Sequence, residues 1–140
     1  MNTTLDSELV NATTHSCQVY DDAYNNNDPQ ALAKLFTEDA TLVTDTGILH
    51  GRDAILKYQI EIFNIIKFSN HKGMADPDSI RPLGTDGKEF LAAGSWSQTV
   101  RIEGGEPFEM KGFWSAIVQN DGTARDSMLT WNITPVDQAK

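Results

Sequence analysis

Residues 23–55 read AYNNNDPQALAKLFTEDATLVTDTGILHGRDAI, and this stretch contains two helix starts on either side of one short strand pair. The Asp-Pro pair at 28–29 starts a helix, because the aspartate caps free amides and the missing N–H of proline is not needed there. We expect this helix to end near Phe36. A β-prone run, an Asp-Thr-Gly turn and a second extended segment follow over residues 40–50, and Gly-Arg-Asp at 51–53 starts another helix.

The rest of the chain divides into a helical and an extended part. Apolar or small residues recur at steps of three and four between Leu9 and Tyr24, which predicts a first helix. An apolar stripe over residues 53–66 predicts the third helix. Four long extended segments follow, joined by tight turns that contain glycine. These segments are residues 68–83, 88–103, 108–119 and 123–134. Pro77 cannot donate to a strand ladder, so the first of them is an edge strand or is broken by a bulge.

Composition narrows the class of protein. The 140 residues fit one domain, residues 1–140, with frayed ends expected at 1–6 and 136–140. A formal net charge of −9 argues against binding to nucleic acid or to an anionic membrane surface. There is no apolar run long enough to span a bilayer and no secretion signal, which predicts a cytoplasmic protein.

Cofactor and metal sites are not indicated by any motif. Cys17 is the single cysteine, which excludes an internal disulfide and a multi-cysteine zinc site. The three histidines lack the close spacing of zinc ligands, and neither a glycine-rich phosphate loop nor a nucleophile elbow is present. We therefore expect no cofactor and no metal.

The order of these signals resembles the nuclear transport factor 2-like superfamily, which includes the ketosteroid isomerases and the SnoaL-like polyketide cyclases. The resemblance implies an α+β fold of the cystatin-like type, a cone in which three N-terminal helices pack on a curved antiparallel sheet and enclose a pocket. Laid over residues 16–51, the ketosteroid isomerases place Tyr20 at their oxyanion-binding tyrosine. Two interpretations of Tyr20 stay open: a donor to an oxyanion, or a core tyrosine.

The same overlay places the other two catalytic elements less well. The general base falls on Thr44, with Asp45 one residue later. Asp45 replaces the base only if the strand bulges or the turn redirects it, and otherwise it forms the turn. The third element, a protonated aspartate, falls on Trp114, which cannot act as a carboxylic acid. The isomerase constellation is therefore incomplete.

His71 is the favoured proton carrier, ahead of Asp45. An unperturbed imidazole titrates nearest to neutral pH. The neighbours of His71 in the strand alternation, Gly73 and Ala75, are small, as the wall of a cavity requires.

The overlay of the last strand implies that Met128, Thr130 and Asn132 face the pocket, with Tyr58 contributed by the third helix. Trp96 and Trp114 share faces with other residues expected inside by strand alternation. Together these six residues are the predicted substrate-binding set, a pocket with aromatic walls and neutral hydrogen-bonding groups. The opposite face of the last strands is apolar and consists of Phe113, Ile117, Leu129 and Trp131. Because a monomer would leave this face in water, we expect a homodimer packed through the outer face of the sheet.

Three functions remain open at this stage, and the expected partner is a small apolar molecule in the pocket. The first function is a cofactor-independent isomerase or cyclase that acts by proton transfer on a small apolar carbonyl or polyketide-like compound. The second is a non-catalytic module that binds a hydrophobic ligand or serves in association. The third is an epoxide hydrolase or dehydratase variant, which needs an acid and a base facing each other across the cavity.

Overall fold

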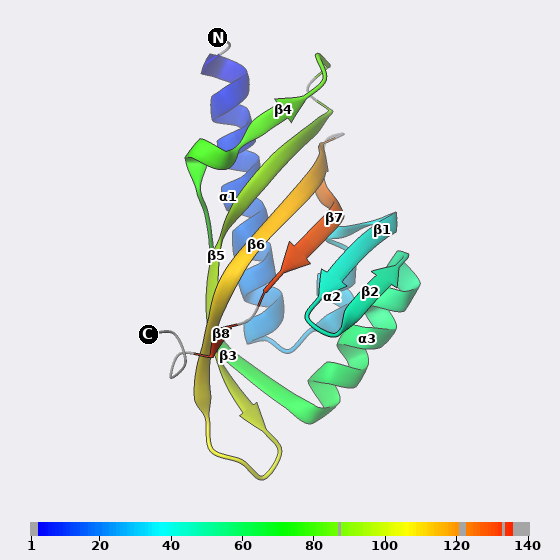
Figure 1. The fold of residues 1–140 in the computed structure, drawn as a ribbon, viewed down its shortest axis with the longest axis vertical. Coiled ribbons are helices and arrows are strands. Elements are labelled where there is room, and N and C mark those ends of the chain that lie inside the picture. The colour runs from blue at the N-terminus through cyan, green and yellow to red at the C-terminus, as the bar shows by residue number, and fades with distance from the viewer. Residues whose placement is uncertain (1–2, 87, 121–122, 133, 136–140) are drawn as a thin grey trace.

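The computed structural model describes residues 3–86, 88–120, 123–132 and 134–135 (Figure 1). Its elements in chain order are α1 (Thr3–Asn25), α2 (Pro29–Ala33), β1 (Phe36–Thr44), β2 (Gly47–His50), α3 (Arg52–Ile65), β3 (Ile66–Ala75), the 3-10 helix η1 (Pro77–Ser79), β4 (Arg81–Leu83), β5 (Glu89–Ile102), β6 (Phe108–Asn120), β7 (Ala124–Trp131) and β8 (Thr134–Pro135). Of the ends expected to fray, residues 1–2 and 136–140 lie outside the described residues, whereas α1 already begins at Thr3. The expected order of helices followed by long strands is confirmed.

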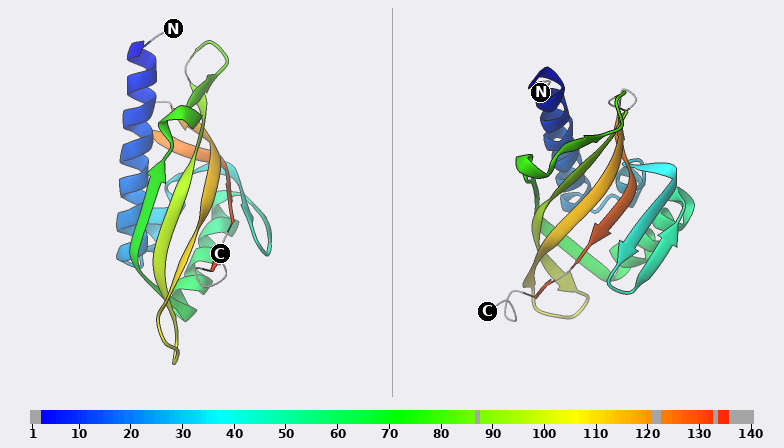
Figure 2. Two further views of the ribbon diagram at one scale, coloured as in Figure 1. Left: turned by 60° about the vertical axis from the view of Figure 1, so that its left-hand side comes forward. Right: turned by 45° about the horizontal axis from the view of Figure 1, so that its top comes forward.

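The strands form one curved sheet in the order β2-β1-β7-β6-β5-β3, with β4 paired to β5 and β8 paired to β6. All of these pairs are antiparallel except β1 with β7, which are parallel. The sheet is therefore mixed, whereas the resemblance implies a wholly antiparallel one. The difference arises because β1 joins the sheet beside a strand from much later in the chain. Figures 1 and 2 show α1 lying along β3, while α3 lies beside β1 and β2.

The helix start at 28–29 is confirmed, since the side chain of Asp28 accepts a hydrogen bond from the backbone N–H of Ala31 at 3.1 Å. The helix ends at Ala33 and not near Phe36. Phe36 already belongs to β1, where it lies opposite Asp126 of β7, and its side chain is fully buried. The start of α2 is thus set by local capping, and its end by pairing with a distant strand.

The expected interruption at Pro77 is also confirmed. β3 ends at Ala75, and η1 separates it from β4. The side chain of Asp76 accepts a hydrogen bond from the backbone N–H of Asp78 at 3.0 Å, which fixes this turn. β3 is the last strand in the sheet order and is therefore an edge strand, and its pairing with β5 is shifted between Ser69 and Lys72.

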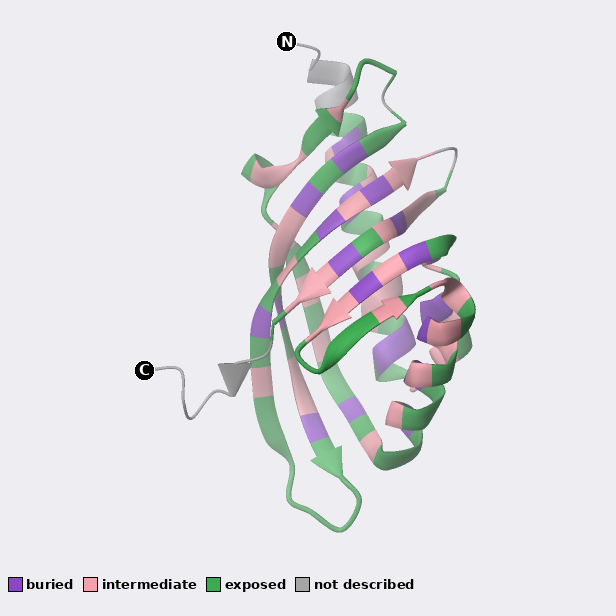
Figure 3. Cartoon of the chain, turned by 45° about the vertical axis from the view of Figure 1, so that its right-hand side comes forward, coloured by how far each residue is buried: buried purple, intermediate pink, exposed green. Residues whose placement is uncertain are grey.

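Buried side chains form two clusters against the inner face of the sheet. One includes Phe36 and Phe90, and the other includes Phe63 and Phe68, while Tyr20 of α1 packs against both. Figure 3 shows buried and exposed positions alternating along β5, as a strand with one covered face requires. Within the described part of the chain, no helix combines the length and the hydropathy needed to cross a membrane.

Candidate functional site

A cavity of about 240 Å³ lies between α1, α3 and the inner face of the sheet. Its walls are mostly apolar and include Phe68, Phe90, Trp96, Val100, Trp114 and Trp131. Its polar lining includes Thr13, Ser16, Tyr20, Tyr58, Gln59, His71, Gln98 and Asp126. An apolar pocket with a few converging polar groups is typical of a site for a small molecule.

Tyr20 of α1 and Asp126 of β7 form a hydrogen-bonded pair in this cavity. The Tyr20 hydroxyl donates to Oδ2 of Asp126 over 2.5 Å. Burial raises the pKa of the Asp126 carboxyl to about 7, and the hydrogen bond from Tyr20 opposes this rise. Burial, together with the charge of Asp126, raises the pKa of Tyr20 well above its usual value. At neutral pH the pair therefore contains a neutral hydroxyl and a carboxyl group that is partly protonated.

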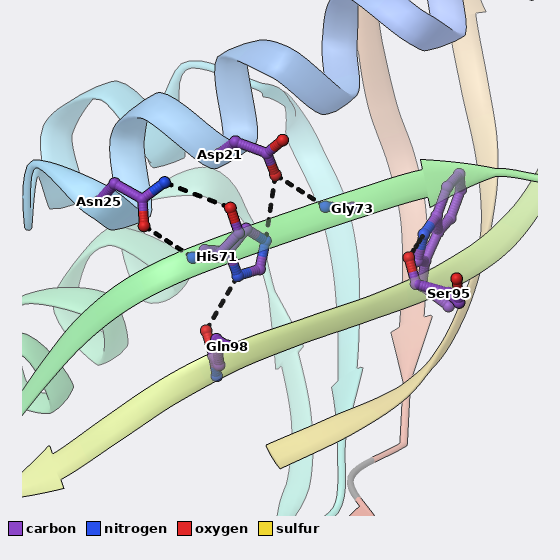
Figure 4. Close-up of polar contacts among 7 residues, drawn as sticks. Asp21, Asn25, His71, Gly73, Ser95 and Gln98 are labelled. Carbon is purple, nitrogen blue, oxygen red and sulfur yellow. Dashed lines mark hydrogen bonds and ion pairs between the residues drawn. The ribbon is translucent and has the colours of Figure 1, made fainter. Parts of the chain in front are cut away.

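His71 of β3 lines the same cavity and has a neighbour at each ring nitrogen (Figure 4). Nδ1 lies 2.9 Å from Oε1 of Gln98, and Nε2 lies 3.7 Å from Oδ1 of Asp21. The tautomer sets the roles of the two nitrogens: Nδ1 donates to the Gln98 oxygen when it carries the hydrogen, and Nε2 points a hydrogen at Asp21 when the hydrogen is there. The ring of Tyr24 stacks on the imidazole, with centroids 4.3 Å apart.

Burial keeps this imidazole neutral. The His71 side chain is 8% exposed, and burial lowers its pKa against the opposing effects of Gln98 and Asp21. Burial also raises the pKa of Asp21, but the hydrogen bond that Asp21 accepts from the backbone N–H of Gly73 at 2.8 Å acts against that rise. A neutral imidazole beside a carboxylate is suited to take up a proton, since the carboxylate stabilises the imidazolium that forms.

A family comparison agrees with this fold. A family model described as a SnoaL-like domain matches residues 18–124. The chain belongs to the SnoaL-like domain family. Tyr20 and His71 lie within the matched segment of this SnoaL-like domain, and Asp126 lies just beyond it.

Solved structures of other proteins share the fold of this SnoaL-like domain. It is similar to a putative scytalone dehydratase from Novosphingobium aromaticivorans DSM 12444, with a TM-score of 0.77 and 18% identity over 99% of each chain. A ketosteroid isomerase-like protein from Erwinia carotovora atroseptica SCRI1043 has a TM-score of 0.76 and 12% identity, over 91% of this chain and 98% of that one. An uncharacterized protein with a cystatin-like fold from Caulobacter vibrioides has a TM-score of 0.69 and 21% identity, over 94% of each chain. These similarities confirm the cystatin-like α+β fold. They concern the fold and not the activity. The sequence has no match among curated proteins.

The structure places two of the three predicted catalytic residues in the cavity and the third outside it. Tyr20 and His71 line the cavity, whereas Asp45 is exposed in the turn between β1 and β2 and is not part of the lining. Of the two alternatives for Asp45, the structure agrees with the turn and not with a base redirected into the pocket, because the pairing of β1 with β2 stays regular up to Thr44 and Gly47. Asp45 is thus a turn residue in this SnoaL-like domain.

The three aromatic residues predicted to bind substrate, Tyr58, Trp96 and Trp114, all line the cavity. The indole N–H of Trp114 donates to the backbone oxygen of Ser95 at 3.2 Å, whereas the buried indole nitrogen of Trp96 has no hydrogen-bond partner among the described residues. A direct role in binding substrate stays a prediction for all three.

The predicted pocket residues of the last strand are on the wrong face, because β7 contains a bulge. Ile117 lies opposite Met128 and Val118 lies opposite Asp126, so Ser127 is an extra residue in β7. One extra residue reverses the facing of every side chain beyond it. The residues thus displaced from the pocket lining are Met128, Thr130 and Asn132. Leu129 and Trp131, expected on the outer face, line the cavity instead.

The outer positions of Met128 and Asn132 follow from their contacts. Met128 is 40% exposed. The side-chain oxygen of Asn132 accepts a hydrogen bond from the backbone N–H of Phe113 at 2.7 Å, so this carboxamide stabilises the strand pair and does not face a ligand.

Sequence reasoning missed two carboxylates of the site, Asp126 and Asp21. Asp126 follows a hairpin turn, where an aspartate is usually solvated. The alternation that predicts Met128 in the pocket also predicts Asp126 there, and this was the available signal. Asp21 belongs to an acidic pair that is typical of a solvated helix face. Its position one helical turn after Cys17, a residue of the apolar face, was the available signal.

No cluster of three or more potential metal ligands occurs in residues 3–86, 88–120, 123–132 and 134–135. Cys17 lines the cavity, where burial and the charges of Asp21 and Asp126 raise the pKa of its thiol to about 11. The thiol therefore stays protonated at neutral pH. The absence of a cofactor and of a metal stays a prediction.

Proposed function

We propose that this SnoaL-like domain is a cofactor-independent isomerase or cyclase that moves a proton on a small, uncharged carbonyl compound. One observation carries the proposal: a single apolar cavity contains both a neutral imidazole, His71, and a hydroxyl–carboxyl pair, Tyr20 with Asp126. The first group is suited to remove a proton next to a carbonyl, and the second to stabilise the negative charge that forms on the carbonyl oxygen.

The proposed reaction has two proton transfers. The imidazole of His71 takes a proton from the carbon next to the carbonyl. The electron pair of the broken C–H bond forms a carbon–carbon double bond, and the π pair of the carbonyl moves to its oxygen. When Asp126 is protonated, its O–H donates to the Tyr20 oxygen, and the Tyr20 hydroxyl is then free to donate to the enolate oxygen. The imidazolium of His71 finally returns the proton to another carbon, which completes an isomerisation.

Asp126 takes the part that the family overlay assigns to a protonated aspartate. The overlay puts that element on Trp114 of β6, whereas the buried carboxyl with a raised pKa lies on the neighbouring strand, β7. Its hydrogen bond to Tyr20 supports a shared role in binding an oxyanion.

The charge of the cavity supports an uncharged substrate. Among the described residues its lining includes Asp126 but no lysine or arginine, and Asp21 lies directly behind His71. An anionic ligand would lose its hydration without gaining a counter-ion. The volume of about 240 Å³ is below the range typical of pockets for drug-sized molecules, which supports a compound with one or two rings.

Elimination of water is the second candidate reaction. It uses the same enolate, which expels a hydroxyl group from the neighbouring carbon, and it needs an acid beside the base. His71 and Tyr20 in one cavity meet this requirement. The structural likeness to a putative scytalone dehydratase is consistent with this candidate at the level of the fold.

The test is hydrogen exchange in heavy water, followed by NMR, on cyclic ketones, β,γ-unsaturated cyclic enones and β-hydroxy ketones. An isomerase shifts the double bond of the enone, and a dehydratase releases water from the hydroxy ketone. His71→Ala should lower the rate by about 10²-fold or more. The wild-type rate should fall in acid, at a pH lower than the usual histidine value of about 6.5, because burial lowers the pKa at which His71 becomes protonated. Binding of these ketones without exchange would support the non-catalytic module instead.

We further propose that the protein forms a homodimer through the outer face of the sheet. Because β7 contains a bulge, Met128 replaces Leu129 and Trp131 on this face. Phe113 is 67% exposed, Met128 40% and Leu91 39%. Adjacent strands β5, β6 and β7 carry these side chains, and burying them against a second copy would remove apolar surface from water.

A further inference from the structure

Two asparagine side chains at the end of α1 and just after it bind backbone groups of the edge strand β3, where a further strand of the sheet would otherwise pair. The carboxamide of Asn25 accepts a hydrogen bond from the backbone N–H of His71 at 2.7 Å and donates to the His71 carbonyl oxygen at 3.2 Å. Asn27 makes the same pair of bonds with Phe68, at 3.3 and 3.5 Å. Figure 4 shows Asn25 reaching from the helix to the backbone of His71.

The spacing of these bonds fits only a bulged strand. In a regular strand the backbone groups that point away from the neighbouring strand recur at every second residue, so Asn70 would follow Phe68. In β3 the pairing with β5 is shifted between Ser69 and Lys72, and Asn70 has a positive φ of 54°. The bulge therefore gives His71 the place that Asn70 would otherwise occupy.

The same shift decides which side chain enters the cavity. Side chains of a strand alternate between its two faces, so a regular strand with Phe68 inside would also have Asn70 inside. In the structure Phe68, His71 and Gly73 line the cavity. The imidazole thus faces inward only while β3 stays bulged at this point.

We infer that Asn25 is a positioning residue for His71: its carboxamide binds both backbone groups of His71, holds the bulge in β3 and keeps the imidazole turned into the cavity. Gln98 and Tyr24 touch the ring itself, whereas Asn25 fixes the backbone from which the ring extends. The effect on turnover rests on the proposed function, but the effect on the position of the ring does not.

The experiment compares Asn25→Ala with Asn27→Gly. The control removes the equivalent carboxamide from the same helix end but leaves the His71 contacts in place, and glycine accepts the positive φ of 52° at position 27. In the wild type, NMR titration should show a His71 pKa below its usual value, because the ring is buried. In Asn25→Ala the pKa should move toward the usual value as the ring gains water, and its NMR contacts to Tyr24 should weaken. Asn27→Gly should change neither.

Turnover supplies a second readout. We expect kcat to fall by about 10-fold or more in Asn25→Ala, with a smaller change in KM, because a displaced base affects the proton-transfer step most. An unchanged His71 titration and unchanged Tyr24 contacts in Asn25→Ala would overturn the inference. If His71→Ala is fully active while Asn25→Ala still moves the ring, the proposed function is wrong and the positioning inference stands. Asn25→Ser, whose hydroxyl is too short to bridge both backbone groups, replaces Asn25→Ala if that variant does not fold.

Discussion

At the scale of single residues, the contact between Tyr20 and Asp126 is the most testable. The hydroxyl of Tyr20 donates to the buried carboxyl and lowers its pKa against the effect of burial. Tyr20→Phe should therefore raise the pKa of Asp126 above its wild-type value of about 7, because the ionised form loses its donor. Carbon NMR of the side-chain carboxyl during a pH titration measures this change. An unaltered titration would show that the two groups do not interact in solution.

Asp126 should also make the stability of the protein depend on pH. Its pKa is about 7 in the folded state and near 3.8 in the unfolded chain, so between these values folding takes up a proton. The free energy of unfolding should therefore fall as the pH rises through this window, by up to about 1.4 kcal/mol per pH unit. Asp126→Asn should lose this dependence, because the amide carries no charge at any pH.

Urea unfolding at a series of pH values measures the difference between Asp126→Asn and the wild type. His71 acts in the opposite sense, since its lowered pKa removes stability as the pH falls below about 6.5. Both proteins contain His71, so its contribution cancels in the difference. Asp45→Asn, at an exposed turn, is the control and should run parallel to the wild type. Parallel curves for Asp126→Asn would mean that Asp126 is not buried as a neutral acid.

At the scale of secondary-structure elements, the close approach of β5 to β3 makes a sharp prediction. A Cβ atom added to Gly94 would collide with the backbone oxygen of Met74. Because a backbone atom cannot move aside as a flexible side chain does, Gly94→Ala should lower the free energy of unfolding by about 3 kcal/mol. Gly47→Ala, where no atom lies within 4 Å of the added carbon, should be nearly neutral. Urea unfolding compares the two, and equal stabilities would contradict the tight packing of β3 on β5.

The sequence predicts correctly those structural features that depend on residues close to one another in the chain. The Asp28 cap, the break at Pro77 and the inward faces of β5 and β6, with Trp96 and Trp114, are all as expected. Alternation with Gly73 predicts the inward facing of His71 correctly, because the two residues lie on the same side of the bulge. Counting from Phe68 would have put Asn70 inside and His71 outside.

The bulge in β7 could not be predicted from the sequence. Ser127 is an ordinary strand residue by composition, and no glycine or proline marks the extra position. Its hydroxyl donates to the backbone oxygen of Ile117 at 3.1 Å, a contact with a neighbouring strand that no pattern along β7 reveals. The error in facing beyond Ser127 has this cause. The oversight of Asp126 does not, since regular alternation with Met128 inside also places Asp126 inside.

At the scale of the whole molecule, the exposed apolar face of the sheet predicts association. Phe113→Glu should convert the proposed homodimer into a monomer, because it places a charge where apolar contact is expected. Ile48→Glu is the control, since Ile48 is 61% exposed but lies on β2 at the far edge of the sheet. Light scattering at micromolar concentration gives the mass of each protein. A wild-type monomer, or a dimer that survives Phe113→Glu, would show that this face does not form the interface.

The candidate site itself belongs to this scale. Tyr20 and Asp126 meet although they are 106 positions apart, and His71 comes from a third region of the chain. Helix periodicity and strand alternation describe one element at a time. They identified Tyr20 and His71 as candidates, but only the three-dimensional fold shows which carboxylate accompanies each of them.

The parallel pairing of β1 with β7 has a consequence for the order in which the chain folds. A hairpin such as β5–β6 closes a short loop and forms early, whereas β1 meets β7 only after most of the chain has been arranged. Until β7 docks beside β1, Asp126 is in water and ionises as an ordinary aspartate. During synthesis on a ribosome, the helices and the first strands can therefore collapse while the chain still lacks its buried acid. We expect the acidity of Asp126 to change in one late step, when the last long strand completes the wall of the cavity.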